Sequence, residues 1–214
     1  LGARRNETAT LLWADRVTKA DLGMLNIVDV KAGTVRLNVT KNHNSHEVPL
    51  GSFLWELLKK RHTKNDSKYV FPVVSESKLV KKPYYSDPRS MIDSLVEELD
   101  ATYKKTYFEQ FLKDKLKSKW NKPRAKKQDA ELLEDFEASY VPHFKFTMHD
   151  LRRTFISVAS NIDGIPYTAV KRLVNHSTKK DITAMYIKYT MPQLRTYMQK
   201  VEDALLEHVN FKKD

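Results

Sequence analysis

The chain has 214 residues, which is enough for one domain and at most two. With 41% hydrophobic and 30% charged residues it has the composition of a globular protein, not of a collagenous or disordered chain. No apolar run approaches the roughly 18 residues of a membrane-spanning helix. The absence of cysteine excludes disulfides, thiolate zinc sites and cysteine nucleophiles. A net charge of +11 favours a polyanionic partner.

The first third of the chain predicts a small sheet flanked by helices. Residues 6–13 form a compact stretch that can be helical. Between residues 29 and 50 apolar and polar residues alternate, which predicts a β-hairpin with its turn near residues 42–45. A helix then begins at Gly51-Ser52, because the apolar residues that follow share one face. That stripe consists of Phe53, Leu54, Leu57 and Leu58.

The middle of the chain, roughly residues 75–142, differs in residue composition from both ends. It predicts helical pieces joined by a basic stretch, since the fifteen residues from Lys113 to Lys127 hold eight basic residues and one acid. Two interpretations stay open for this stretch, a solvated helix face or a nucleic-acid contact surface.

The last third predicts three amphipathic helices. Apolar residues at spacings of three and four predict a helix over 150–162 that closes at Asp163-Gly164. Pro166 fits the first turn of a second helix. A third helix runs from Pro192 towards Val209, and its apolar stripe needs a surface to cover. Together these elements predict an α+β fold, predominantly α-helical, with a small antiparallel β-hairpin or sheet near the N-terminus.

Four segments carry side chains suited to phosphate chemistry. His149 and Arg152 stand three apart at the start of a helix, where they share a face and where positive potential favours an anion. Taken alone, this pair is more typical of a surface histidine and a structural arginine than of an active site. The other three segments add Arg4 near the N-terminus, Lys41 in the hairpin turn, and His176 followed by Tyr186. No comparable set of metal ligands is present in the sequence.

In their order along the chain, these segments resemble the catalytic domain of tyrosine recombinases, specifically the integrases of phages and mobile elements. The resemblance covers the chain from end to end, apart from residues 75–142. The matching stretches are Gly2-Ala3-Arg4-Arg5-Asn6-Glu7, Leu12-Trp13-Ala14-Asp15, Val39-Thr40-Lys41, Val48-Pro49-Leu50, His149-Asp150-Leu151-Arg152-Arg153-Thr154-Phe155, Leu173-Val174-Asn175-His176-Ser177 and Asp181-Ile182-Thr183-Ala184-Met185-Tyr186.

The resemblance implies a single catalytic domain over residues 1–214, with 75–142 as a basic insertion within it. The family carries a further helix and a separate DNA-clamping domain before its first arginine, and the chain opens at Leu1 without an initiator methionine. We therefore expect that this sequence is a fragment of a longer protein. Its net charge predicts DNA binding that weakens steeply with salt.

Residue by residue, the resemblance makes Arg4 and Arg152 a pair that clamps the phosphate, with His149 and His176 as the two active-site histidines. The other assignments are Lys41 as the hairpin lysine, Tyr186 as the nucleophile, Arg5 and Arg153 as noncatalytic neighbours, and Glu7 as a supporting carboxylate.

These residue types suit attack on a phosphodiester. Guanidinium groups bind its non-bridging oxygens in bidentate fashion and neutralise it. The attacking tyrosine, with a free pKa near 10, must lose its proton, and His149 is expected to accept it while His176 hydrogen-bonds the phosphate. Lys41 is expected to protonate the leaving 5′ oxygen. The resulting 3′-phosphotyrosyl bond conserves the energy for religation, so no ATP, metal or other cofactor is implied.

Two departures from the family pattern concern the last segments. Asn175 stands where the family commonly has glycine, and Tyr186 lies about one residue further from His176 than expected. Tyr189, three residues on, is therefore an alternative nucleophile, although the residues leading into Tyr186 favour Tyr186. We expect packing roles for Tyr189, Tyr167 and Tyr197.

The resemblance also implies partners. They are double-stranded DNA and further copies of the chain in a tetrameric synapse, with no membrane, in the cytoplasm of a bacterial or phage-infected cell. The C-terminal stripe from Leu194 to Val209 either docks on a neighbouring protomer or packs on its own domain. Rival functions are a type IB topoisomerase, a DNA-binding regulator without catalysis, and, less favoured, histidine-based metal hydrolysis.

Overall fold

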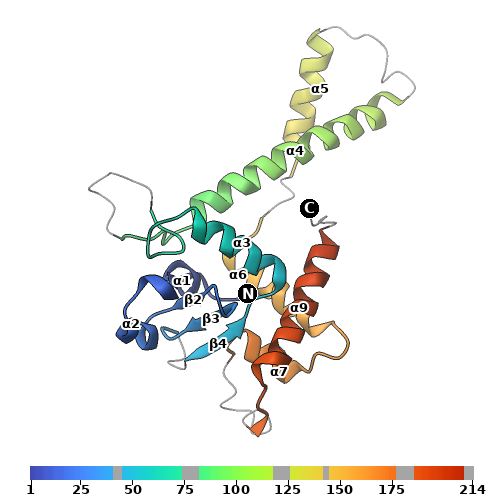
Figure 1. Cartoon of the computed structure of the whole chain (residues 1–214). Coiled ribbons are helices and arrows are strands. Elements are labelled where there is room, and N and C mark those ends of the chain that lie inside the picture. The colour runs from blue at the N-terminus through green and yellow to red at the C-terminus, as the bar shows by residue number, and fades with distance from the viewer. Residues whose placement is uncertain (41–44, 74–81, 118–125, 142–144, 177–185, 210–214) are drawn as a thin grey trace. The chain divides into compact units, whose positions relative to one another are not determined.

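The computed structural model of the chain describes residues 1–40, 45–73, 82–117, 126–141, 145–176 and 186–209. The chain forms two compact units, one made of Leu1–Asp87 with Met148–Asp214 and the other of Pro88–Thr147. A four-stranded sheet lies near the N-terminus, and the other regular elements are helices (Figure 1). This is the α+β, predominantly helical fold that the sequence predicts.

The sheet of the first unit has the strand order β1-β2-β3-β4. Strands β3 (Thr34–Leu37) and β4 (His46–Pro49) are antiparallel, with Val35 opposite Val48 and Leu37 opposite His46. They are the two strands of the predicted hairpin, and residues 42–44 of the turn predicted near residues 42–45 lie outside the described residues. Strand β2 (Ile27–Asp29) is antiparallel to β3, and β1 (Leu12–Trp13) is parallel to β2.

The first helix is shorter than the sequence predicts. Helix α1 covers only Arg5–Ala9 of the stretch expected to be helical, and Leu12 and Trp13 belong to β1 instead. Both side chains are buried, and the backbone N of Leu12 donates to the carbonyl of Asn26 at 2.9 Å. A two-residue strand shows no periodicity of its own, so only its pairing with β2 reveals it.

The remaining helices of this unit follow the predictions closely. Two short helices, η1 (Ala14–Arg16) and α2 (Lys19–Met24), precede β2, and the longer ones are α3 (Ser52–Thr63), α6 (Met148–Ser160), α7 (Tyr167–Leu173) and α9 (Met191–His208). Helix α3 begins at the expected serine, and α6 starts two residues before its predicted start. Pro166 caps α7 from outside its first turn, and α9 follows the predicted tail helix.

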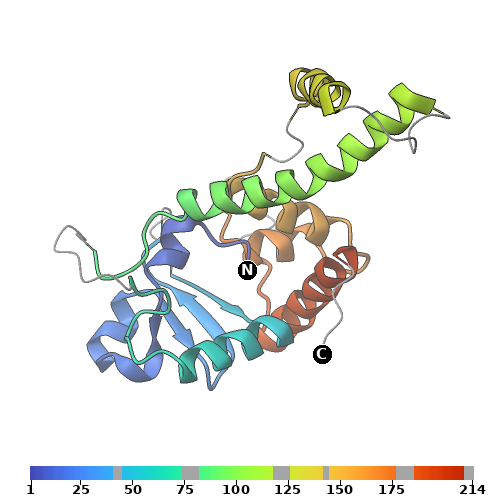
Figure 2. The same ribbon diagram turned by 90° about the horizontal axis from the view of Figure 1, so that it is seen from above.

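The core of the first unit lies between the sheet and helices α6, α7 and α9, which gather beside β4 (Figure 2). Val28, Val35 and Val48 of the sheet belong to the same buried cluster as residues from all three helices. This cluster joins the N-terminal 50 residues to the last third of the chain, and so brings the predicted arginine segments into one unit. The helical members are Phe155, Ala159, Ala169, Val170, Leu173, Leu194, Met198 and Val201.

The C-terminal helix α9 packs on its own unit. Leu194, Met198 and Val201 are buried in the core, and the Glu202 carboxylate accepts hydrogen bonds from the backbone N of Phe53 and Leu54 at 2.7 and 2.9 Å. These are N–H groups in the first turn of α3, which a side-chain acceptor satisfies. Of the two predicted roles for the C-terminal stripe, the structure has the packing role.

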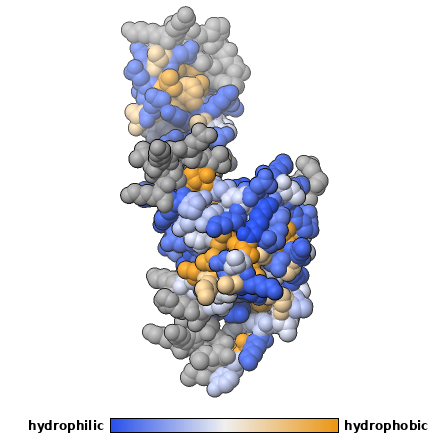
Figure 3. All heavy atoms as spheres, turned by 60° about the vertical axis from the view of Figure 1, so that its left-hand side comes forward, coloured by the Kyte–Doolittle hydropathy of each residue, from blue (hydrophilic) through white to orange (hydrophobic). Residues whose placement is uncertain are grey.

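The second unit contains helices α4 (Arg89–Leu116) and α5 (Lys126–Ser139), which confirms the predicted helical pieces. Its identification as an insertion in a catalytic domain stays a prediction. None of the described helices combines the length and apolarity needed to cross a membrane. On the face drawn in Figure 3, each unit presents a group of hydrophobic residues bordered by hydrophilic ones.

Candidate active site

The N-terminal segment reaches the core through a close approach at Gly2. Its φ of +58° lies in the left-handed region, and an added Cβ would stand 2.7 Å from Cδ1 of Phe155 and 3.0 Å from Cγ1 of Val174. Both the conformation and the space therefore require glycine. This contact places the Gly2 carbonyl against α6 and brings the next residues beside the end of α7.

Arg4 is fixed by the carboxylate of Glu7. One oxygen of this carboxylate accepts a hydrogen bond from the Arg4 backbone N, and the other accepts one from Nη1, each at 2.8 Å. Glu7 is buried with 3% of its surface exposed, whereas the Arg4 side chain is 27% exposed. A charge-assisted contact of this kind restrains the guanidinium. The predicted supporting role of Glu7 is consistent with this geometry.

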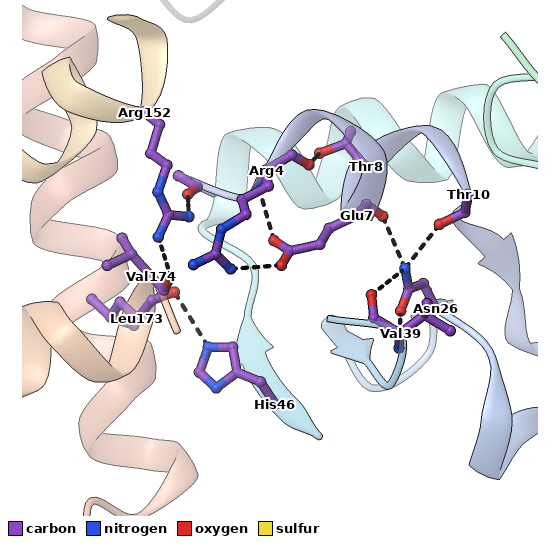
Figure 4. Close-up of polar contacts among 11 residues, drawn as sticks. Arg4, Glu7, Thr8, Thr10, Asn26, Val39, His46, Arg152, Leu173 and Val174 are labelled. Carbon is purple, nitrogen blue, oxygen red and sulfur yellow. Dashed lines mark hydrogen bonds and ion pairs between the residues drawn. The ribbon is translucent and has the colours of Figure 1, made fainter. Parts of the chain in front are cut away.

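Arg152 on α6 forms hydrogen bonds to two distant parts of the chain. Its Nη1 donates to the carbonyl of Gly2, and its Nη2 donates to the carbonyl of Val174 at 2.5 Å (Figure 4). The residue is only 4% exposed. A guanidinium has five N–H groups, and within the described residues the other three of Arg152 have no acceptor.

The two arginines lie side by side, as Figure 4 shows. Burial lowers the pKa of Arg152 from its ordinary value, and the positive charge of Arg4 lowers it further, while Glu7 acts in the opposite direction. Two guanidinium groups thus lie in a partly desolvated place, and the Glu7 carboxylate forms an ion pair only with that of Arg4 among the described residues. Because the local charge is positive and N–H donors are left over, this site favours an anion.

His176 is brought to the arginines by a turn at the end of α7. The backbone N of His176 donates to the Lys171 carbonyl at 3.0 Å, and that of Asn175 donates to the Arg172 carbonyl at 3.4 Å. This pair of bonds is a Schellman motif, whose pivotal residue is left-handed and usually glycine. Asn175 is that residue, with φ of 51°. The departure from glycine thus falls where asparagine is the common substitute.

The positive charges of both arginines act on the pKa of His176. Its pKa is lowered by burial first, then by the charges of Arg152, Arg4 and Lys171. The imidazole is therefore held towards its neutral form, in which one ring nitrogen donates a hydrogen bond and the other accepts one.

His46 is a buried member of this cluster that sequence reasoning missed. It lies on β4 with 1% of its surface exposed, and its Nε2 is 3.4 Å from the Leu173 carbonyl. Burial lowers its pKa to about 4, with Arg172 the next contribution. The ring is neutral at pH 7 and has one N–H. Because a carbonyl oxygen can only accept a hydrogen bond, Nε2 carries the proton and donates this hydrogen bond to the Leu173 carbonyl. Its Nδ1 has no partner among the described residues.

The other predicted site residues are not brought together with the arginines. His149 lies in the first turn of α6 with an exposed side chain, although Arg152 in the same helix is buried. Tyr186 is 82% exposed, and no contact joins it to Arg4, Arg152 or His176 within the part of the chain that the structure describes. Lys41 lies outside the described residues.

Tyr189 differs from Tyr186 in having partners. Its hydroxyl is hydrogen-bonded to Oγ1 of Thr168 at 2.5 Å, and its ring meets that of Tyr197 edge-on at 6.0 Å. Both rings pack against the core. These contacts agree with the packing roles expected for Tyr189 and Tyr197.

A cavity of about 520 Å³ lies on the β1 side of the sheet and includes none of the predicted site residues. Its polar side chains bond within the protein, since Arg16 donates to three main-chain carbonyls and Asn26 bonds to Thr10 and Val39. No group of three or more potential ligands able to hold a metal ion occurs among the described residues. The arginine pair is therefore the stronger candidate site.

The chain matches no protein-family model, no curated protein and no solved structure. A function must therefore be inferred from the residues themselves. Their arrangement provides two cations side by side, a histidine held towards its neutral form, and a buried carboxylate that fixes the more exposed cation.

Proposed function

We propose that this protein cleaves and rejoins DNA strands through a covalent 3′-phosphotyrosyl intermediate, as a site-specific recombinase of the integrase type. The observation that carries the proposal is the pairing of Arg4 with Arg152. The first comes from the N-terminal segment and the second from α6, yet their guanidinium groups lie together around a site with spare N–H donors. An arginine that only stabilises the fold does not need a second positively charged side chain beside it.

In the proposed reaction the phosphate is held by Arg4 and Arg152, which neutralise its non-bridging oxygens. The hydroxyl oxygen of Tyr186 attacks phosphorus, and the bond from phosphorus to the 5′ oxygen breaks. The tyrosine proton passes to a base, for which His149 is the candidate, and Lys41 supplies a proton to the leaving 5′ oxygen. One phosphodiester replaces another, so the bond energy is kept for the reverse step with a new strand.

The surroundings of the two candidate nucleophiles support Tyr186. Its exposed hydroxyl can reach a bound strand, whereas the Tyr189 hydroxyl is already engaged with Thr168 and its ring is packed. Recruiting Tyr189 would break that packing. Because Tyr186 is not in contact with the arginines, the proposal requires it to approach them when DNA binds.

The proposed reaction is tested by trapping the covalent intermediate. The probe is a labelled duplex pool with randomised sequence around one phosphate and a nick a few nucleotides to its 3′ side, at low salt. Cleavage releases the short fragment, so the adduct cannot religate. We expect a covalent protein–DNA product that is lost in Tyr186→Phe and kept in Tyr189→Phe.

Other outcomes assign other functions. DNA binding without any adduct would contradict the proposal and favour a regulator. Loss of the adduct in Tyr189→Phe alone would move the nucleophile. On an intact duplex without the nick, a protein that rejoins only the original strand, even when a competing 5′-hydroxyl strand is supplied, would favour topoisomerase activity.

A further inference from the structure

The end of α7 has carbonyl groups that the backbone around it does not satisfy, because the last four carbonyls of a helix have no partner within it. The turn into His176 supplies two backbone N–H groups, which bond to the carbonyls of Lys171 and Arg172. The next two carbonyls, those of Leu173 and Val174, accept no backbone N–H among the described residues. Both residues are buried, so these carbonyls need partners from elsewhere in the fold.

Side chains from two other elements provide these partners. His46 of β4 donates from Nε2 to the Leu173 carbonyl at 3.4 Å. Arg152 of α6 donates from Nη2 to the Val174 carbonyl at 2.5 Å, and Figure 4 shows both contacts. Consecutive carbonyls are therefore held by the imidazole and by one arginine of the candidate site. His176 follows only two residues later.

The His46 ring is suited to hold a buried carbonyl. Burial lowers its pKa to about 4, and the charges of Arg172 and Arg152 lower it as well. The hydrogen bond to Leu173 and the charge of Glu7 act in the opposite direction without restoring the ordinary value. The ring is therefore neutral at pH 7, and its one N–H is used for the Leu173 carbonyl.

We propose that His46 is a positioning residue of the arginine site, which keeps the Val174 carbonyl within reach of Arg152 and keeps His176 beside the two arginines. This inference rests on the proposed function, since it gives His46 a part in that reaction through other residues. Without the imidazole donor, the Leu173 carbonyl would be buried and unpaired, so the chain after α7 would shift to find a partner. A displacement of about 1 Å in a site can slow a reaction by about 100-fold.

The first test follows the position of His176 without any reaction. The pKa of His176 is lowered by burial first and then by the charges of Arg152, Arg4 and Lys171. Movement away from these groups should therefore raise it. NMR titration of the whole chain measures this pKa in wild type and two variants, and the signal is assigned by its loss in His176→Gln.

The two variants differ in whether they keep the hydrogen-bond donor. His46→Phe has a ring but no donor, whereas His46→Gln keeps an amide N–H near the place of Nε2. We expect His46→Phe to raise the pKa of His176 towards its ordinary value. We expect His46→Gln to leave that pKa at the wild-type value.

The second test compares rates of adduct formation at saturating protein, with the nicked duplex pool. We expect His46→Phe to slow the reaction by about tenfold or more without weakening DNA binding, and His46→Gln to restore most of the rate. Val28→Ala is the matched control for lost core packing. It removes buried side-chain atoms from β2, which β3 separates from β4. The control should leave both the rate and the pKa of His176 unchanged.

Three results would overturn the proposal. They are a folded His46→Phe protein with the wild-type pKa of His176, a His46→Gln protein as impaired as His46→Phe, and a Val28→Ala protein with the same defects. If His46→Phe does not fold, the nitrogen chemical shifts of the wild-type His46 ring decide instead. A proton on Nε2 would support the proposal, and a proton on Nδ1 would overturn it.

The NMR result is independent of cleavage. A His46→Phe effect on the pKa of His176, in a protein that forms no covalent adduct, would support the positioning of the site and contradict the proposed reaction. An adduct that forms equally fast in His46→Phe and wild type, with no change in that pKa, would do the reverse.

Discussion

Glu7 holds Arg4 by two hydrogen bonds of 2.8 Å, one from the arginine backbone N and one from Nη1. The carboxylate is buried, and the guanidinium that it fixes lies next to that of Arg152. Glu7 therefore sets the direction of the more exposed arginine.

Replacing this carboxylate should reduce the reaction rate more than it reduces stability. Glu7→Gln puts an amide donor against N–H donors of Arg4, so one of the two contacts is lost and the guanidinium is released. We expect adduct formation to slow by about tenfold, in line with the roughly 1.5–3 kcal/mol of a charged hydrogen bond.

Asp21→Asn is the matched control for Glu7→Gln. Asp21 occupies the same place in the first turn of α2, where it accepts a hydrogen bond from the backbone N of Thr18. Adduct formation at the wild-type rate is expected for this control. If both variants had the same rate, Glu7 would have no special part in the site.

The left-handed turn at Asn175 predicts an unusual order of stabilities. A Cβ in this conformation costs roughly 1–2 kcal/mol, which glycine avoids. Asn175→Ala and Asn175→Gly remove the same side-chain contacts, so their difference reports the backbone alone. We expect Asn175→Gly to be the more stable by about 1 kcal/mol in urea unfolding. An alanine variant as stable as the glycine variant would contradict the turn.

The buried His46 should make stability fall in mild acid. Its pKa is about 4 in the folded protein against about 6.5 when unfolded, so between these values the unfolded state binds more protons. The stability contributed by the neutral ring is complete above pH 6.5 and is lost as the pH falls towards 4. Between pH 7 and 5 the loss should be roughly 2 kcal/mol.

Urea unfolding at both pH values measures this loss, and His46→Phe should remove it. Should that variant fail to fold, NMR titration of the wild-type imidazole gives the same information directly. A ring that titrates near 6.5 in the folded protein would contradict the assigned burial.

Sequence patterns predicted those parts of the fold whose side chains repeat. The stripe of Phe53, Leu54 and Leu58 marks α3, and the alternation around Val35 and Val48 marks β3 and β4. Strand β1 was missed because two residues have no period and only pairing with β2 defines them. Docking of α9 on α3 through Glu202 is likewise a tertiary contact that the helical period of the tail does not contain.

The candidate site shows the same division. The neighbourhood of Arg4 and Arg152 was expected from the resemblance alone, because nothing local links segments so far apart in the chain. His46 lies in none of the stretches that carry the resemblance, so no motif marks it. The alternation of His46 with Val48 along β4 was the signal that it faces the core, since both are buried.

The central claim is that two arginines neutralise one phosphate, and it is tested most directly by removing the charge of that phosphate. A methylphosphonate placed at the cleaved position of a nicked duplex selected from the pool is neutral and should need less cationic help. On normal DNA we expect Arg4→Ala and Arg152→Ala to lose at least 100-fold in the rate of adduct formation, and Arg5→Ala to lose little. On the methylphosphonate substrate, the loss in the rate of adduct formation that each site variant shows relative to wild type should be at least tenfold smaller. Folded variants that lose the same rate on both substrates would show that the arginines only hold the fold together, and would contradict the claim.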